Sequence, residues 1–299
     1  MKKTEFDDII KQNLIKRYGE DKFGYCLSKN YENYYSKNEF EAFLTEMKEK
    51  FPTAFSQYDF GKGSELKEQK GRHGSYPPKM ASVASSSRFC YISLRNGGKA
   101  IGTDEPAQFE VGLKIEGIDG ISPQLDACFL KQNIFIEAKC HEIFDNHKVI
   151  LKEKYWEHLY GKDNEFAFPV QDKTCEKEFE IPLNKFGIEK ANSMFDIKQL
   201  LCHLMGIASQ KDTEARATLI YLFFMPKTDD GEASEKIKTV FDELKEEIKN
   251  IFCSEPIKYF TEKNKIKLIA IAQHAEVMEE LTNENIIYML DTNIKEVPL

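Results

Sequence analysis

Three residues near the middle of the chain have types and spacing that suit hydrolysis of a phosphodiester bond. Asp126 lies in one apolar run, and Glu137 and Lys139 lie in the next. Two carboxylates offer the oxygen ligands that a hard divalent cation prefers. A lysine beside them supplies positive charge where an attacking water or a charged transition state needs it. The set therefore indicates a metal-dependent phosphodiesterase site.

The local sequence predicts that a β-hairpin holds these residues. Apolar runs of strand length flank Gln132-Asn133, and Asn tolerates the left-handed backbone that tight turns need. A two-residue loop at this point pairs Asp126 with Lys139. Because side chains alternate along a strand, Asp126, Glu137 and Lys139 then share one face of the hairpin. A slip of one residue would separate them.

An acid-x-Lys triplet alone says little here, because the chain contains eight of them. They begin at Glu20, Glu46, Glu65, Glu68, Glu137, Asp196, Glu243 and Glu247. Seven lie in polar or helical surroundings, where such charges decorate a solvated face. The triplet at Glu137 lies in an apolar strand, with a second acid on the paired strand. The alternative is a cross-strand ion pair between Asp126 and Lys139, worth about 0.2–1 kcal/mol, but this pair leaves Glu137 without a cation.

Asp126, ten intervening residues and then Glu137-Ala138-Lys139 resemble the PD-(D/E)XK nuclease superfamily. The similarity is specific over the hairpin and extends in element order over residues 60–275, with Leu125 where the name's proline stands. It implies a Mg²⁺- or Mn²⁺-dependent nuclease whose metal is held by Asp126, Glu137 and the Ala138 carbonyl. Lys139 would orient or deprotonate water, or stabilise the transition state. An unperturbed lysine pKa of about 10.4 favours charge stabilisation.

The resemblance also implies accessory residues, because superfamily members often add a glutamate from an upstream helix and a polar residue from a later one. Glu65, with Ser64 as a helix cap, is the first candidate, and Glu110 in an alternating run is its rival. Each also fits an exposed surface acid. On a later amphipathic helix we expect Gln199 at the site, with a solvated face as the alternative, and His203 one turn further on.

Positive charge is concentrated before the hairpin, although the whole chain has a formal net charge of −8. Residues 60–100 hold eight basic and two acidic residues, together with several glycines. Such a segment suits contact with a phosphate backbone, and a solvated loop is the alternative. The predicted nucleic-acid contacts are Lys62, Lys67, Arg72, Lys79 and Arg88, with Ser85, Ser86 and Ser87 as further phosphate donors.

The expected function is that of a Mg²⁺-dependent endonuclease acting on DNA, in restriction, repair or defence. Double-strand cleavage by two copies of the site suggests a homodimer. Two alternatives stay open: a non-catalytic nucleic-acid-binding protein of the same fold, and a metal-dependent hydrolase of a small phosphoester. Closely paired ligands are missing for a zinc site, since there is no CxxC among the scattered residues Cys140, His141, His147, Cys202 and His203.

Apolar periodicity predicts a helical extension over residues 1–60 and a nuclease-like domain over 61–299. The expected fold is α/β and restriction-endonuclease-like: a central mixed β-sheet flanked by helices. Its expected elements are a helix at 79–93, a strand at 108–116, the hairpin at 123–140, a helix at 147–160, the Gln199 helix, a strand at 217–225, a long amphipathic helix over 237–251 and a strand at 266–271.

Cysteine usage and hydropathy bear on the compartment. The seven Cys residues are scattered without the spacing of a disulfide framework, which favours a reducing environment. The charged N-terminus carries no apolar export segment, and no run approaches the about 18 apolar residues that cross a bilayer. We therefore expect a cytoplasmic protein without membrane contact.

Overall fold

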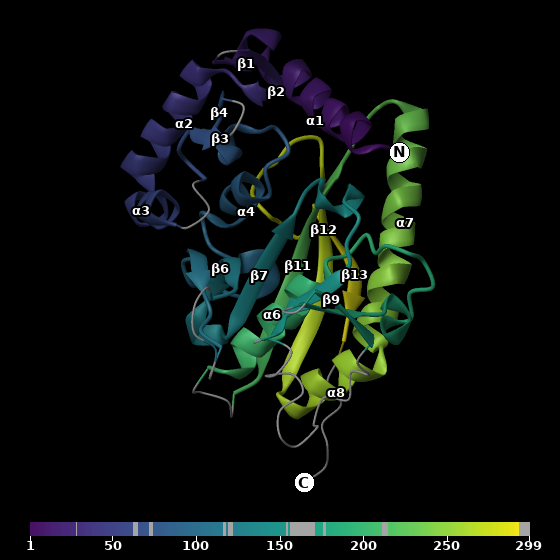
Figure 1. Cartoon of the computed structure of the whole chain (residues 1–299). Coiled ribbons are helices and arrows are strands. Elements are labelled where there is room, and N and C mark those ends of the chain that lie inside the picture. Colours follow the sequence, from purple (N-terminus) through teal and green to yellow (C-terminus); the bar gives the residue numbers. More distant parts are fainter. Residues whose placement is uncertain are drawn as a thin grey trace.

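A six-stranded mixed sheet lies at the centre of the computed structural model (Figure 1). The structure describes residues 1–27, 29–61, 65–71, 74–115, 118, 122–153, 155, 171–175, 178–210 and 215–292. The strand order is β13-β12-β11-β7-β6-β5, in which β7, β11 and β12 run parallel and the other neighbours are antiparallel. The strands are β5 (Gln108–Gly112), β6 (Gln124–Phe129), β7 (Ile134–Lys139), β11 (Ala217–Pro226), β12 (Ile266–Ala275) and β13 (Ile286–Asp291).

Helices cover both faces of this sheet. The Phe89 ring of α4 (Ser86–Leu94) lies 5.4 Å from that of Phe224 in β11. On the other face, the Tyr221 ring lies 4.6 Å from Phe195, which precedes α6 (Ile197–Ala208), and 6.2 Å from Phe252 of α7 (Gly231–Cys253). Positions 221 and 224 project to opposite faces because side chains alternate along a strand. Burial on both faces explains why β11 is apolar almost throughout.

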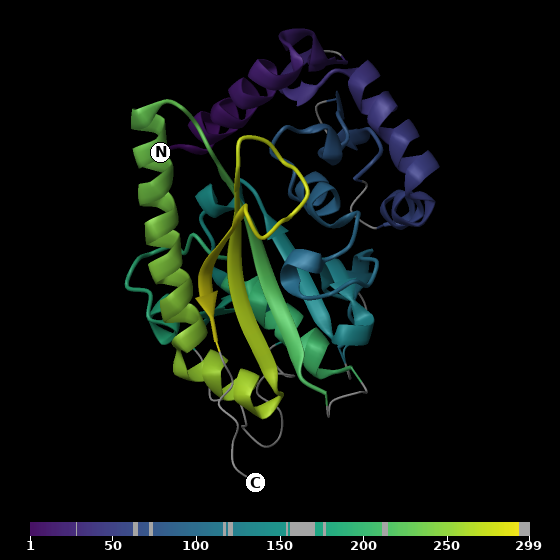
Figure 2. The ribbon, with the colours of Figure 1, turned by 180° about the vertical axis from the view of Figure 1, so that it is seen from behind.

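The N-terminal region arches over the carboxyl ends of β7 and β11 (Figures 1 and 2). Three contacts from its first helix hold it there: Lys3 with Asp145 at 2.9 Å, Asp7 with His141 at 2.7 Å, and the Asn13 amide with the Lys227 carbonyl at 2.6 Å. The elements are α1 (Lys3–Tyr18), β1 (Phe23–Cys26), β2 (Asn30–Tyr35), α2 (Lys37–Lys50) and α3 (Pro52–Phe60). This region is largely helical as expected, but its Tyr-rich part forms the β1-β2 hairpin. The division of the chain at residue 60 stays a prediction.

Several predicted elements differ from the structure, most clearly at residues 149–152. A helix was expected over 147–160, but Val149–Lys152 is strand β8, which pairs with β10 (Glu178–Ile181), whereas Glu153 and Tyr155 are helical as expected. Alternate burial of Val149 and Leu151 favours the strand; residues 154 and 156–160 lie outside the described part. β9 (Gln171–Cys175) completes this small sheet.

The helix expected at 79–93 begins later, at Ser86, because the Ser85 hydroxyl caps it by accepting the Arg88 amide at 3.2 Å. The strand expected at 108–116 ends at Gly112. The elements not predicted, besides those already named, are β3 (Gln69–Gly71), β4 (Gly74–Tyr76) and α8 (Glu255–Lys263).

The coarse fold prediction is confirmed: the chain is mixed α/β, with a central mixed sheet and seven α-helices in its described part. The strand at 217–225, the long helix after it and the strand at 266–271 all lie where the pattern placed them. None of the helices in the described ranges is both long enough and apolar enough to span a bilayer.

Candidate active site

The hairpin that carries the predicted site has a different register from the one expected. Ala127 pairs with Ile136, and Phe129 pairs with Ile134. The two-residue loop was wrong: four residues connect the strands as a 3₁₀ turn that ends at Asn133, whose φ is 52°. The slip is two residues, an even number, so every side chain keeps its face. By this register Asp126 lies opposite Glu137 rather than opposite Lys139.

The backbone pairing of β6 and β7 ends next to Asp126 and Glu137. The last paired residues are Ala127 and Ile136. Beyond them the Ala138 amide donates to Oδ2 of Asp126 at 2.8 Å instead of to the β6 backbone. Because the N–H and C=O of a strand residue point to the same side, the Ala138 carbonyl also projects toward this gap. Two oxygen donors, one carboxylate and one carbonyl, are therefore held close together.

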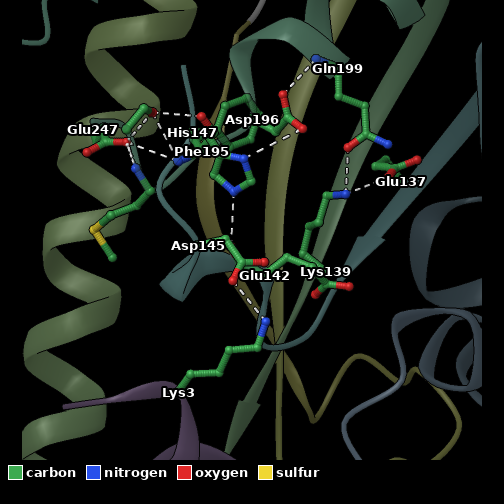
Figure 3. A network of polar contacts seen from close by, with 12 residues as sticks. Lys3, Glu137, Lys139, Glu142, Asp145, His147, Phe195, Asp196, Gln199 and Glu247 are labelled. Carbon is green, nitrogen blue, oxygen red and sulfur yellow. Dashed lines mark hydrogen bonds and ion pairs between the residues drawn. The ribbon is translucent and has the colours of Figure 1, made fainter. Parts of the chain in front are cut away.

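Lys139 lies between a carboxylate and an amide (Figure 3). Its Nζ is 2.7 Å from Oε1 of Glu137 and 2.6 Å from Oε1 of Gln199. Burial alone would lower the pKa of Lys139, but the carboxylates of Glu137, Glu142 and Asp126 outweigh it and hold that pKa above its ordinary value. Lys139 therefore carries an ammonium group, which suits charge stabilisation and not proton abstraction.

Helix α6 brings Gln199 and His203 to the same face. The Asp196 side chain caps this helix by accepting the Gln199 backbone amide at 2.9 Å. This contact fixes the backbone position from which the Gln199 side chain extends. His203 is buried, and its Nε2 lies 2.9 Å from the Gln124 carbonyl and 3.7 Å from Oε2 of Glu137. Burial lowers the pKa of His203, so the ring is neutral and its Nε2–H donates to Gln124.

Both candidates for the accessory acid, Glu65 and Glu110, lie near Asp126 and Glu137. Glu65 is 5% exposed and pairs with Lys79 at 3.0 Å, so a role as an exposed surface acid is excluded for it. It follows α3 in a turn and not on a helix, and the proposed cap Ser64 lies outside the described residues. Glu110 has a positive φ of 53°. Burial and the neighbouring Glu65 raise the pKa of Glu110 to about 7, and Glu137 adds to the shift.

The excess of carboxylates suits a bound cation. Burial raises the pKa of Asp126 well above its ordinary value, and Glu137 raises it further. The oxygen donors of Asp126, Glu137 and Ala138 are the kind that Mg²⁺ or Mn²⁺ prefers. Within the described ranges, no group of three His, Cys, Asp or Glu side chains is close enough together to hold a metal ion. This holds for a magnesium site and for a zinc site alike.

The three predicted nucleic-acid contacts that the structure describes, Lys67, Lys79 and Arg88, each have partners within the protein. Lys67 and Lys79 are 61% and 53% exposed, and each pairs with an acid, Asp59 and Glu65 respectively. The Arg88 guanidinium is enclosed between two aromatic rings. The remaining two, Lys62 and Arg72, lie outside the described residues.

A cavity of about 280 Å³ opens beside Glu65 and Lys79. The serines at the start of α4 line it with His141 and Glu142, which follow β7. Glu142 was not predicted as a site residue; its carboxylate accepts the Cys140 amide at 2.7 Å and raises the pKa of Lys139. Its signal was an acid three residues beyond Lys139, at the end of the strand.

Comparison with protein-family models, with curated proteins and with solved structures gives no match. The resemblance to PD-(D/E)XK nucleases therefore depends on the hairpin residues and on the order of the elements around them.

The shifted pKa of Glu110 predicts a pH-dependent stability. The folded-state pKa of Glu110, about 7, lies above the ordinary 4.5. The stability that the protein has with Glu110 protonated is therefore fully present below pH 4.5 and is lost as the pH rises through 7. Without metal, Glu110→Gln should therefore gain about 2 kcal/mol of unfolding free energy over the native protein between about pH 5 and pH 8. Urea unfolding in EDTA measures this, with the exposed Glu284→Gln as control. Equal curves at both pH values would contradict the burial of Glu110.

Proposed function

We propose that the protein is a metal-dependent nuclease that hydrolyses DNA phosphodiester bonds. One observation carries the proposal: Asp126, Glu137, Lys139 and Gln199 come from three separate elements and gather on one face of the sheet. A structural ion pair would need neither the second acid nor the amide. Apart from the small sheet β8-β10-β9, which is inserted between β7 and α6, the order of α4, β5, β6, β7, α6 and β11 agrees with the helix, three strands, helix, strand core of the PD-(D/E)XK fold, which we propose for this chain.

In the proposed mechanism, Asp126, Glu137 and the Ala138 carbonyl would hold Mg²⁺ or Mn²⁺. When bound, the ion supplies positive charge to phosphate oxygens and makes water more acidic. The Lys139 ammonium stabilises the negative charge that grows on the phosphorus oxygens. Gln199 accepts a hydrogen bond from Lys139 and so fixes the position of the Lys139 ammonium group. The Asp126 carboxylate is itself oriented by the Ala138 amide.

The surroundings of the acids support a phosphate-rich substrate. The cavity beside Glu65 is lined by Lys79 and by Ser86 and Ser87 in the first turn of α4, together with the acids Glu65 and Glu142. Helix N-termini, lysines and hydroxyls are ordinary phosphate contacts in DNA-binding proteins. This cavity gives the phosphate next to the cleaved bond a place to bind.

Cleavage assays test the proposal and separate it from its alternatives. Supercoiled plasmid, single-stranded DNA and RNA are each incubated with the protein in Mg²⁺, in Mn²⁺ and in EDTA. We expect metal-dependent cleavage of DNA and none in EDTA. Salt-sensitive DNA binding without cleavage in either metal would indicate the non-catalytic binder. Turnover of bis(p-nitrophenyl) phosphate without DNA affinity would indicate a small-phosphoester hydrolase.

Gln199→Ala should slow cleavage by about tenfold, because Lys139 loses the contact that aims it but keeps its charge. We expect the effect in kcat, with KM for DNA unchanged. Gln199→Glu keeps an acceptor oxygen and should retain more activity than the alanine variant. Equal rates for Gln199→Ala and the native protein would show that Gln199 does not position Lys139.

A further inference from the structure

A second cavity, of about 360 Å³, is lined mainly by residues of α1, α2 and α4. Arg88 and Ile92 of α4 line it, whereas Ser86 and Ser87 of the same helix line the cavity beside Glu65. Asp126, Glu137, Lys139 and Gln199 are not among its lining residues. Most of its lining is apolar or aromatic. The lining residues are Leu14, Tyr18, Lys22, Tyr35, Glu39, Ala42, Phe43, Glu46, Arg88, Ile92 and Met278.

Arg88 is the unusual member of this lining. It is 7% exposed, and its guanidinium carbon lies 3.9 Å from the Tyr35 ring centroid and 4.1 Å from that of Phe43. Its Nη1 donates to the Met80 carbonyl at 3.1 Å, whereas its Nε is buried without any partner in the described part of the chain. No described carboxylate forms an ion pair with it. Buried arginines are almost always paired with an acid, so Arg88 lacks the polar partner that its burial calls for.

The acids in the lining are already neutralised by other residues. Glu39 pairs with Lys22 at 2.8 Å. Glu46 lies 3.2 Å from Lys50. The formal charges of the lining residues Lys22, Arg88, Glu39 and Glu46 sum to zero, but Arg88 is the one of the four that forms no ion pair with a described residue. An occupant with one negative charge would pair with Arg88, whereas a dianion would also meet the two carboxylates.

We infer that this cavity binds a small organic carboxylate. The carboxylate would accept from Nη2 of Arg88, because Nη1 already donates to Met80 and Nε has almost no accessible surface. A hydrogen bond between a guanidinium and a carboxylate is charge-assisted and about twice as strong as a neutral one. The body of the ligand would lie against Leu14, Ile92 and Met278, in a space of ordinary size for a small-molecule site.

Benzoate is a suitable probe, because it joins one carboxylate to a compact apolar ring. Titration calorimetry at fixed ionic strength should give a Kd on the order of 1 mM. Neutral benzamide and inorganic phosphate should each bind at least about tenfold more weakly. EDTA is present throughout, so the outcome does not depend on the nuclease activity. Absence of benzoate binding at about 20 mM, or tighter binding of phosphate, would overturn the inference.

Variants locate the binding. Arg88→Lys keeps the charge but loses the planar guanidinium that the Tyr35 and Phe43 rings hold in place, and should weaken benzoate binding at least about tenfold. Ala42→Trp, at an exposed position on the rim, should block the cavity without touching Arg88. Thr45→Trp, exposed on the same helix but outside the lining, is its matched control and should bind as the native protein does. Unchanged affinity in both Arg88→Lys and Ala42→Trp would place the benzoate elsewhere.

Discussion

Replacing Lys139 with alanine is expected to lower the rate of Mg²⁺-dependent DNA cleavage by about 1,000-fold. Lys139 is the ammonium group placed among the proposed ligands, and the surrounding carboxylates keep it charged. In a site where it is 14% exposed, water cannot replace that charge efficiently. Initial rates of plasmid nicking under single-turnover conditions measure the loss.

Lys198→Ala is the matched control for this experiment. Lys198 closes another acid-x-Lys triplet and lies on α6 beside Gln199, but its side chain is exposed. Its removal should change the rate less than about twofold. Lys139→Ala with near-native activity, or equal losses in both variants, would count against the assigned role of Lys139.

Glu247→Ala is expected to cost about 3 kcal/mol of unfolding free energy, which lowers the melting temperature by about 5 °C. Oε1 of this buried residue on α7 accepts the Ser193 hydroxyl at 2.6 Å and the amides of Met194 and Phe195 at 2.7 and 3.1 Å (Figure 3). The change leaves these donors unsatisfied. The segment leads directly into the Asp196 cap, so cleavage should also fall.

Glu246→Ala provides the comparison for this stability effect. Glu246 is the neighbouring acid on the same helix, but it is exposed, and its one ion pair among the described residues is with Lys249 at 3.5 Å. We expect its loss to change the unfolding free energy by less than about 0.5 kcal/mol. Glu247→Gln, which keeps an acceptor oxygen, should lie between the two. Thermal unfolding with equal midpoints for all variants would show that the 193–195 segment is held by other contacts.

The candidate site was largely predictable because its main signal is local. Alternation alone assigns Asp126, Glu137 and Lys139 to one face, and it does so for any even slip of the hairpin. The register itself was not predictable in the same way. Four loop residues form a 3₁₀ turn closed by the Asn133 amide on the Leu130 carbonyl, which the sequence does not distinguish from a two-residue turn.

The features that could not be predicted depend on contacts between distant segments. Val149–Lys152 becomes a strand because β10, some thirty residues later, pairs with it. Arg88 looked like an exposed phosphate contact, but the Tyr35 and Phe43 rings from the N-terminal region enclose it. The positive φ of Glu110 likewise has no signal in a run that simply alternates.

The most direct test of the proposed nuclease compares the native protein with Asp126→Asn in one plasmid-cleavage time course with Mg²⁺. The variant keeps the size of the side chain and an oxygen for the Ala138 amide, but it removes the charge that would hold the metal. We predict cleavage by the native protein that EDTA abolishes, and a rate for Asp126→Asn lower by at least about 100-fold. Native cleavage that Asp126→Asn reproduces within about twofold would contradict the account, as would a native protein that cleaves nothing in either metal.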